Sequence, residues 1–179
     1  MNLCNQCGLC CNGVMFHTVR LQPADSAKEL AALGLKLKRK KGAHYIIQPC
    51  PAWRDSQCSI YAARPERCRV FECRQLQRVA AGETTEAAAL GKIRDVQRRV
   101  AQVYELLARA GSTSPKRPLS KGCEKIMAEP LDASSDPAAL ALRHDLTQAM
   151  QELNAILNAD FRLIPIGASG AEEEPTVPS

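Results

Sequence analysis

The segment Cys4-Asn5-Gln6-Cys7-Gly8-Leu9-Cys10-Cys11 gathers four of the chain's nine cysteines and decides how the first part of the chain can fold. Four further cysteines follow at wider intervals, at Cys50, Cys58, Cys68 and Cys73. Thiolate sulfur is the soft ligand that zinc and iron-sulfur clusters select, and short fixed spacings let one turn of backbone direct two sulfurs toward one ion. The pattern therefore indicates bound metal, with these eight cysteines as candidate ligands.

The amino-acid composition suggests that such a metal would also stabilise the fold. Of 179 residues, 45% are hydrophobic, which is ordinary for a globular chain, but only 4% are aromatic. A cysteine-rich region with few large side chains gains little from burial alone, and metal ligation commonly takes the place of core. We therefore expect a small domain that is stabilised by metal.

The amino-terminal residues and the lack of long apolar runs indicate in which cellular compartment the protein is expected. Met1-Asn2-Leu3-Cys4 shows no basic region followed by an apolar stretch, and no run approaches the ~18 apolar residues of a membrane span. We expect a cytoplasmic protein that does not enter a membrane. Because cytoplasmic thiols stay reduced and nine is an odd number, a disulfide framework is disfavoured relative to metal binding.

The spacing constrains how the sulfurs could share metal ions. Cys4, Cys7 and Cys10 recur at intervals of three, so a tight turn or short helix places several sulfurs on one side. Cys10 and Cys11 are adjacent, and adjacent side chains diverge by ~100° on a helix. These two therefore serve different sites or a bridged one. Eight thiolates suit two separate four-coordinate sites or a multinuclear cluster, and both alternatives stay open.

Short elements are expected between the cysteines. Residues 14–21 read as a strand that is largely apolar on both faces, and residues 35–48 read as a hairpin with a turn at Lys41-Gly42. Residues 23–33 read as a helix that ends at Gly34 and buries Leu30 and Leu33.

A further helix is expected to begin after Arg64-Pro65 and to carry Cys68 and Cys73. On a regular helix these two cysteines would lie ~140° apart. Either the helix is interrupted between them or the two thiols face different metals.

Apolar residues at intervals of three and four predict two longer amphipathic helices after residue 86. The first contains Ile93, Val96, Val100, Val103 and Leu107, and the second contains Leu142, Leu146, Ala149, Leu153 and Leu157. The chain is therefore predicted to be α+β: a cysteine-cluster domain over residues 1–82, a helical hairpin over 83–166 and a disordered tail over 167–179.

Taken in order, the motifs resemble the YkgJ-type CxxCxxCC cysteine-cluster family of zinc- or iron-chelating domains. The resemblance rests on Cys4-x-x-Cys7-Gly8-x-Cys10-Cys11, then Cys50-Pro51, then Cys58-Ser59-Ile60-Tyr61-x-x-Arg64-Pro65-x-x-Cys68-Arg69-x-Phe71-x-Cys73. It covers about the first eighty residues and all eight cysteine positions of the family pattern. It implies that these eight cysteines bind zinc or iron in a bacterial cytoplasmic protein, whereas Cys123 has no counterpart.

Catalysis is less well supported than metal binding. A similar domain occurs in the flagellin lysine methylases, but the chain shows no Gly-rich nucleotide or S-adenosylmethionine loop. We expect a metal-binding protein without catalytic residues rather than an enzyme. The alternative is an iron-sulfur protein that transfers electrons or supports a redox or methyl-transfer enzyme. A third interpretation is a helical interaction protein with incidental cysteines, in which chelation would leave folding unchanged. The C-terminal helices are the candidate surface for a protein partner.

Several other residues have both an ordinary and a chemical interpretation. His17 and His44 lie near cysteines in sequence, but eight thiolates already satisfy two tetrahedral sites, so packing or surface roles are favoured. The lysines of residues 36–41 are expected to protect a strand edge rather than to bind nucleic acid.

Residues near the last ligands are expected to support the metal. Arg64, Arg67 and Arg69 would offset thiolate charge, and Trp53 would pack over the cluster. Cys123 lies near lysines that could lower its pKa, yet no motif supplies a base, so an ordinary thiol is expected.

Overall fold

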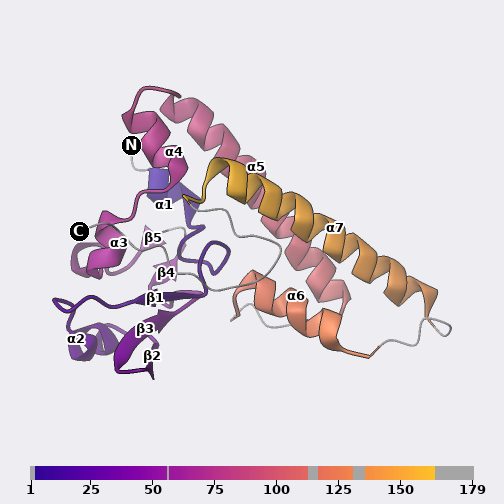
Figure 1. Cartoon of the computed structure of the whole chain (residues 1–179), viewed down its shortest axis with the longest axis horizontal. Coiled ribbons are helices and arrows are strands. Elements are labelled where there is room, and N and C mark those ends of the chain that lie inside the picture. Colours follow the sequence, from indigo (N-terminus) through magenta and orange to yellow (C-terminus); the bar gives the residue numbers. More distant parts are fainter. Residues whose placement is uncertain (1–2, 56, 113–116, 131–135, 164–179) are drawn as a thin grey trace.

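The computed structural model describes residues 3–55, 57–112, 117–130 and 136–163. Short helices and strands form one end of the molecule, and long helices extend away from it (Figure 1). The elements are α1 Leu3–Cys7, β1 Thr18–Arg20, α2 Ala27–Ala32, β2 Leu37–Lys40, β3 Ala43–Ile47, β4 Trp53–Arg54, β5 Gln57–Cys58, the 3-10 helix Tyr61–Ala63, α3 Glu66–Val70, α4 Arg74–Ala80, α5 Glu86–Arg109, α6 Leu119–Ala128 and α7 Pro137–Asp160. The predicted α+β class is confirmed.

The larger sheet has the strand order β1-β3-β2, and both pairs are antiparallel. Thr18 lies opposite Ile47, and Leu37 lies opposite Ile46. The predicted hairpin is confirmed, because β2 and β3 are joined at Lys41 and Gly42, both with positive φ. A two-residue turn of this kind matches the natural twist of the strands it connects.

The predicted strand over residues 14–21 is mostly wrong. Only Thr18–Arg20 pairs with the sheet, since the preceding residues form a turn. The Val14 N–H donates to Asn12 Oδ1 at 3.1 Å, and the Met15 N–H donates to the Leu9 carbonyl at 3.0 Å. The turn buries Val14 and Met15 among the helices rather than on the sheet.

The predicted helix over residues 23–33 is shorter than expected. It begins after Ser26, whose hydroxyl accepts a hydrogen bond from the Glu29 N–H at 3.3 Å. A serine at this position satisfies one of the N–H groups that have no partner within the helix. Leu30 is buried as expected, but Leu33 lies at the end of the helix with 47% of its surface exposed. The chain then turns at Gly34, which has φ +88°.

The two predicted long helices, α5 and α7, are confirmed and run antiparallel side by side (Figure 1). The helical extension also contains α6, which the sequence pattern did not suggest. This third helix packs against both long ones. The extension is therefore a three-helix arrangement rather than a hairpin, and the proposed tail over 167–179 lies outside the described residues.

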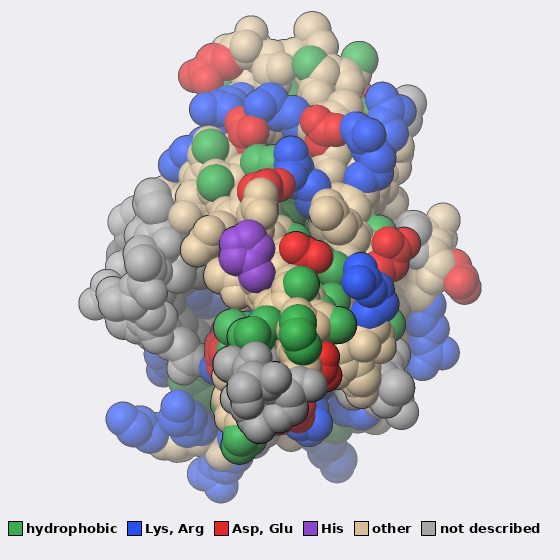
Figure 2. Space-filling view, turned by 90° about the vertical axis from the view of Figure 1, so that its right-hand side faces the viewer, with side chains coloured by type: hydrophobic (Ala, Val, Ile, Leu, Met, Phe, Trp, Pro, Cys, Tyr) green, Lys and Arg blue, Asp and Glu red, His purple; other side chains and the backbone are tan. Residues whose placement is uncertain are grey.

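The surface of the long helices carries a mixture of charges. Figure 2 views these helices from the end away from the sheet and shows cationic and anionic side chains interspersed over them, with a group of hydrophobic side chains nearest the viewer. Arg99 of α5 pairs with Glu152 of α7 at 2.7 Å, and both side chains are exposed. Exposed pairs of this kind contribute little to stability. Among the described residues, no helix combines the length and the apolar character needed to cross a bilayer.

Buried side chains form two separate hydrophobic clusters. The helical cluster is built from α1, the turn that follows it and the long helices: Leu3, Leu9, Val14, Met15, Ala89, Ile93, Val96, Val100, Val103, Leu106, Leu107, Leu119, Cys123, Ile126, Leu146, Ala149, Leu153, Leu157 and Phe161. The sheet cluster is much smaller: Leu21, Leu30, Leu35, Ile46 and Ala52. The first cysteine segment therefore shares its core with the C-terminal helices.

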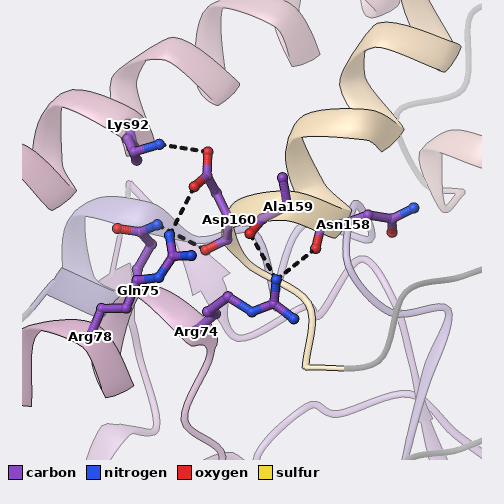
Figure 3. Close-up of polar contacts among 7 residues, drawn as sticks. All are labelled: Arg74, Gln75, Arg78, Lys92, Asn158, Ala159 and Asp160. Carbon is purple, nitrogen blue, oxygen red and sulfur yellow. Dashed lines mark hydrogen bonds and ion pairs between the residues drawn. The ribbon is translucent and has the colours of Figure 1, made fainter. Parts of the chain in front are cut away.

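The carboxyl end of α7 is fastened to α4 (Figure 3). The Arg74 guanidinium donates to the carbonyls of Asn158 and Ala159, at 3.2 and 2.8 Å. Gln75 Nε2 donates to the Asp160 carbonyl at 2.8 Å. The last carbonyls of a helix have no N–H partner within it, so these side chains supply the missing donors.

The Asp160 carboxylate adds two ion pairs to this clamp. It contacts Arg78 of α4 at 3.1 Å and Lys92 of α5 at 2.7 Å (Figure 3). Three helices thus meet at one carboxylate whose side chain is only 17% exposed.

Candidate metal centre

The first four cysteines lie on α1 and on the tight turn after it. Cys4 and Cys7 belong to α1, and the Gly8 N–H donates to the Cys4 carbonyl at 3.3 Å. Gly8 has φ +67°, and its carbonyl then accepts from the Cys11 N–H at 2.8 Å. Glycine adopts this left-handed conformation without the steric penalty of a Cβ, so the chain can turn back within one residue.

The carboxyl end of α1 is held by α5. Gln97 Nε2 donates to the carbonyls of Gln6 and Cys7, at 2.7 and 3.2 Å. A residue far along the chain thereby supports the first pair of candidate ligands, and nothing in the spacing of the cysteines indicated it.

A backbone hydrogen bond joins the first cysteine segment to the second. The Cys50 N–H donates to the Cys11 carbonyl at 2.7 Å. The Trp53 N–H donates to the Cys50 carbonyl at 3.0 Å, and Trp53 lies opposite Cys58 in the small β4–β5 ladder. Cys11, Cys50 and Cys58 are therefore brought to one place by main-chain contacts.

The helix expected to carry Cys68 and Cys73 is interrupted. Cys68 lies on α3, and Cys73 is the residue that immediately precedes α4. Phe71, in the break between them, packs edge-on against Phe16, with ring centroids 5.1 Å apart. The interruption removes the ~140° separation that a regular helix would impose.

Asp25 supports α3, although its sequence position gave no sign of this role. Its Oδ1 accepts from the Glu66 N–H at 2.9 Å, and its Oδ2 accepts from the Gln22 N–H at 2.8 Å. An acidic side chain at the first turn also suits the exposed N–H groups there.

Burial and mutual repulsion disfavour ionised thiols in the first segment. Burial raises the pKa of Cys7 to about 12, and repulsion from Cys73 and Cys4 adds to the shift. Burial also raises the pKa of Cys10 well above its usual value, with Cys7, Cys11, Cys73 and Cys4 as the charged neighbours that add to it. Burial, followed by Cys73, raises the pKa of Cys4.

Three further thiols show the same effect with different neighbours. Burial raises the pKa of Cys11 to about 12, and repulsion from Cys50, Cys68 and Cys58 adds to it. Burial raises the pKa of Cys68 to about 11, with Cys50 and Cys58 next in effect. Burial, opposed by hydrogen bonds from backbone N–H groups, raises the pKa of Cys50, and Cys58 adds to the rise.

The positive charge of Arg64 influences the thiols of Cys4 and Cys68, which are far apart in the sequence. Its guanidinium stacks 3.7 Å from the centroid of the Tyr61 ring, and its Nε donates to the Tyr61 carbonyl at 3.2 Å. Burial raises the pKa of Cys4 and of Cys68, and the positive charge of Arg64 offsets part of each rise. This is the charge-offsetting role that the sequence suggested for Arg64.

The structure also gives the positions of the three histidines of the chain and of Trp53. His17 Nε2 lies 2.6 Å from the Ser120 hydroxyl on α6, and the exposed side chain of His144 lies on α7. His44 lies on β3 opposite Arg39. Trp53 packs against the first cysteine turn, because a Cβ on Gly8 would come within 2.3 Å of its ring. These contacts agree with the packing interpretation for His17 and Trp53.

Cys123 has surroundings opposite to those of a reactive cysteine. It is buried in the helical cluster, and burial raises its pKa to about 11, with Glu124 adding to the rise. A nucleophilic cysteine requires a lowered pKa. The burial and the raised pKa of Cys123 agree with the expectation of an ordinary thiol.

Within the described residues, no disulfide joins the cysteines, and no three Cys, His, Asp or Glu side chains stand in an arrangement that could hold a metal ion.

Comparison with known families agrees with the motif pattern. Residues 3–91 match the family model described as "CxxCxxCC: Putative zinc- or iron-chelating domain". The chain belongs to this family through that domain, which extends from α1 into the second turn of α5. Neither the curated proteins nor the solved structures gave a match to the chain.

Proposed function

We propose that the protein binds zinc or iron through eight cysteine thiolates in the bacterial cytoplasm. The proposed ligands are Cys4, Cys7, Cys10, Cys11, Cys50, Cys58, Cys68 and Cys73. The observation that carries the proposal is that main-chain contacts bring cysteine-bearing segments far apart in sequence together, through the Cys11–Cys50 backbone hydrogen bond and the pairing of Trp53 with Cys58. Membership of a zinc- or iron-chelating family supports it.

The chemistry of the donor set fits a soft divalent cation. Burial and mutual repulsion favour the protonated form of the Cys7 and Cys11 thiols, whose pKa values are raised, and a bound metal would displace those protons because a coordinating thiol is deprotonated outright. Arg64 would offset part of the negative charge that remains on the thiolates.

The metal would serve structure or metal handling rather than catalysis. Complete thiolate sets leave no open position for substrate, and catalytic zinc requires one. The alternative use, as an iron-sulfur protein in electron transfer or in support of a redox or methyl-transfer enzyme, depends on the same cysteines. A protein partner at the C-terminal helices stays a prediction.

Elemental analysis tests the proposal and separates the alternatives. The chain would be purified without oxygen and without metal-affinity resin, and assayed for zinc, iron and acid-labile sulfide. About two zinc ions and no visible absorption are expected for closed zinc sites. Iron with labile sulfide and a brown colour would identify the iron-sulfur alternative. A well-folded chain that carries no metal and takes up neither zinc nor iron on reconstitution would refute metal binding.

A further inference from the structure

The two hydrophobic clusters divide the candidate ligands between them. Cys7, Cys10 and Cys73 pack against the helical cluster. Cys50 and Cys58 pack against the sheet cluster instead. The two clusters have no buried residue in common. Five of the eight cysteines are thereby assigned to two different cores by their packing alone.

Main-chain contacts place two more cysteines. Cys4 lies one helical turn before Cys7 on α1, and the hydrogen bond from Gly8 to the Cys4 carbonyl closes that turn. Cys11 lies beside Cys50, because its carbonyl accepts the Cys50 N–H at 2.7 Å. Cys4 thus joins the group at the helical cluster, and Cys11 joins the group at the sheet cluster.

Cys68 is placed by the anchoring of α3. The Glu66 N–H is bound by Asp25, in the segment that leads into α2, and α2 supplies Leu30 to the sheet cluster.

We infer, on the basis of the proposed function, that the eight cysteines form two separate four-thiolate sites whose boundary falls between the adjacent Cys10 and Cys11. The first site consists of Cys4, Cys7, Cys10 and Cys73. The second site consists of Cys11, Cys50, Cys58 and Cys68. Each set supplies four thiolates, which is the number that a tetrahedral zinc site requires. Because adjacent side chains diverge, Cys10 and Cys11 can belong to different sites.

Two matched double variants test this division. Cys10→Ser/Cys73→Ser removes two ligands from one site, whereas Cys11→Ser/Cys73→Ser removes one ligand from each. The two proteins differ only in which of two neighbouring cysteines is replaced. Full-length chains would be stripped of metal, reconstituted with zinc under reducing conditions and counted by native mass spectrometry. We expect two ions in the wild-type chain, one in the first variant and none retained tightly in the second.

A measurement on the wild-type chain excludes misfolding of the variants as the explanation. With one equivalent of zinc bound, rapid alkylation and fragment mapping would show which cysteines are protected. We expect either Cys10 or Cys11 to be protected together with the three partners assigned to it. The circular dichroism of both double variants should retain the helical signal of α5 and α7.

The outcomes separate this inference from the function on which it rests. Equal loss of all zinc in both double variants, or protection of all eight thiols together, would indicate a bridged cluster and overturn the division. Such a result would leave metal binding intact. A wild-type chain that takes up no zinc and no iron would overturn metal binding and the division with it.

Discussion

The ring of Trp53 lies directly against Gly8, so closely that a Cβ on Gly8 would stand 2.3 Å from Trp53 Cζ2. Gly8 belongs to the turn between Cys7 and Cys10. Trp53 lies on β4, opposite Cys58 on β5. The contact therefore closes the first cysteine segment onto the second. Only a residue without a side chain leaves room for the ring, and Gly8 also has φ +67°.

Gly8→Ala is expected to destabilise the protein by about 3 kcal/mol. A positive φ costs a residue with a Cβ about 1 kcal/mol, and displacement of the partly buried Trp53 ring adds the rest. Gly82→Ala is the matched control, since Gly82 has φ +73° but nothing within 4 Å of the added Cβ. Urea unfolding of both variants would measure the difference. Equal losses would show that the Trp53 contact does not matter.

The edge-on contact of Phe16 with Phe71 should appear as a measurable coupling energy. Such pairs are worth about 0.5–1.5 kcal/mol beyond the area they bury. A double-mutant cycle with Phe16→Leu and Phe71→Leu isolates this contribution, because leucine keeps most of the hydrophobic volume. Strict additivity of the two single losses would contradict the contact.

Asp160→Asn should loosen the junction of α4, α5 and α7. The substitution removes the charge that holds Arg78 and Lys92 while keeping the shape of the side chain. Because both cations are more than one-third exposed, we expect a loss of only about 1 kcal/mol, which should diminish in high salt.

Asp95→Asn is the control for this change, since Asp95 pairs with Arg98 on an exposed part of α5. Thermal unfolding at two salt concentrations would compare the variants. A larger effect at Asp95 than at Asp160 would contradict the importance of the junction.

Cys123 should react slowly with alkylating agents in the folded protein. Its pKa is raised to about 11, chiefly by burial, so on the order of one thiol in a thousand is ionised at pH 8. The thiolate is the reactive form, and the rate should rise about tenfold per pH unit until the pH approaches 11. Mass mapping of iodoacetamide labelling from pH 7 to 10 would measure this profile. A rate at pH 8 equal to that of the unfolded chain would refute it.

Removal of metal should affect the sheet more than the long helices. The sheet cluster has only five buried residues, whereas the helical cluster extends along α5, α6 and α7. A small core needs the additional stabilisation that ligation supplies. Hydrogen exchange after chelation is expected to accelerate at the amides of β1 and β3, with the centres of α5 and α7 as internal controls. Unchanged exchange in the sheet would exclude a structural role for the metal.

Helical periodicity was the most reliable signal in the sequence. Val96 and Val103 on α5, and Leu153 on α7, each belong to a series of apolar residues spaced as in an amphipathic helix. All three are almost completely buried. α6 shows the same spacing in Leu119, Cys123 and Ile126, but it has only 10 residues and follows a Gly- and Pro-containing connector. A short pattern of three apolar residues occurs too often by chance to predict a helix.

The strand over residues 14–21 could not be corrected from local sequence. Its apolar residues belong to two different cores: Val14 and Met15 lie in the helical cluster, while Val19 and Leu21 lie in or against the sheet cluster. A run that is apolar on both faces fits a buried strand equally well. Only the tertiary packing shows that the chain crosses from one core to the other within this stretch.

The candidate ligands were predicted individually, but their grouping was not. Spacing along the chain indicated cysteines of the metal-binding type, and the family match agrees with it. The proximity of Cys11 to Cys50, and of Cys73 to the first segment, depends on contacts between residues tens of positions apart. Local periodicity carries no information about such pairings.

Because α7 packs against α5 and α6 and is clamped to α4 at its last turn, a movement at the clamp would turn these packed helices together. Arg74, directly after Cys73, holds the last turn of a helix that is 24 residues long, and at 1.5 Å per residue its other end lies about 36 Å away. A rotation of about 10° at the clamp would move that far end by about 6 Å on this geometry. A small displacement near Cys73 would therefore be amplified along α7, at a distance where spin labels or fluorophores could record it.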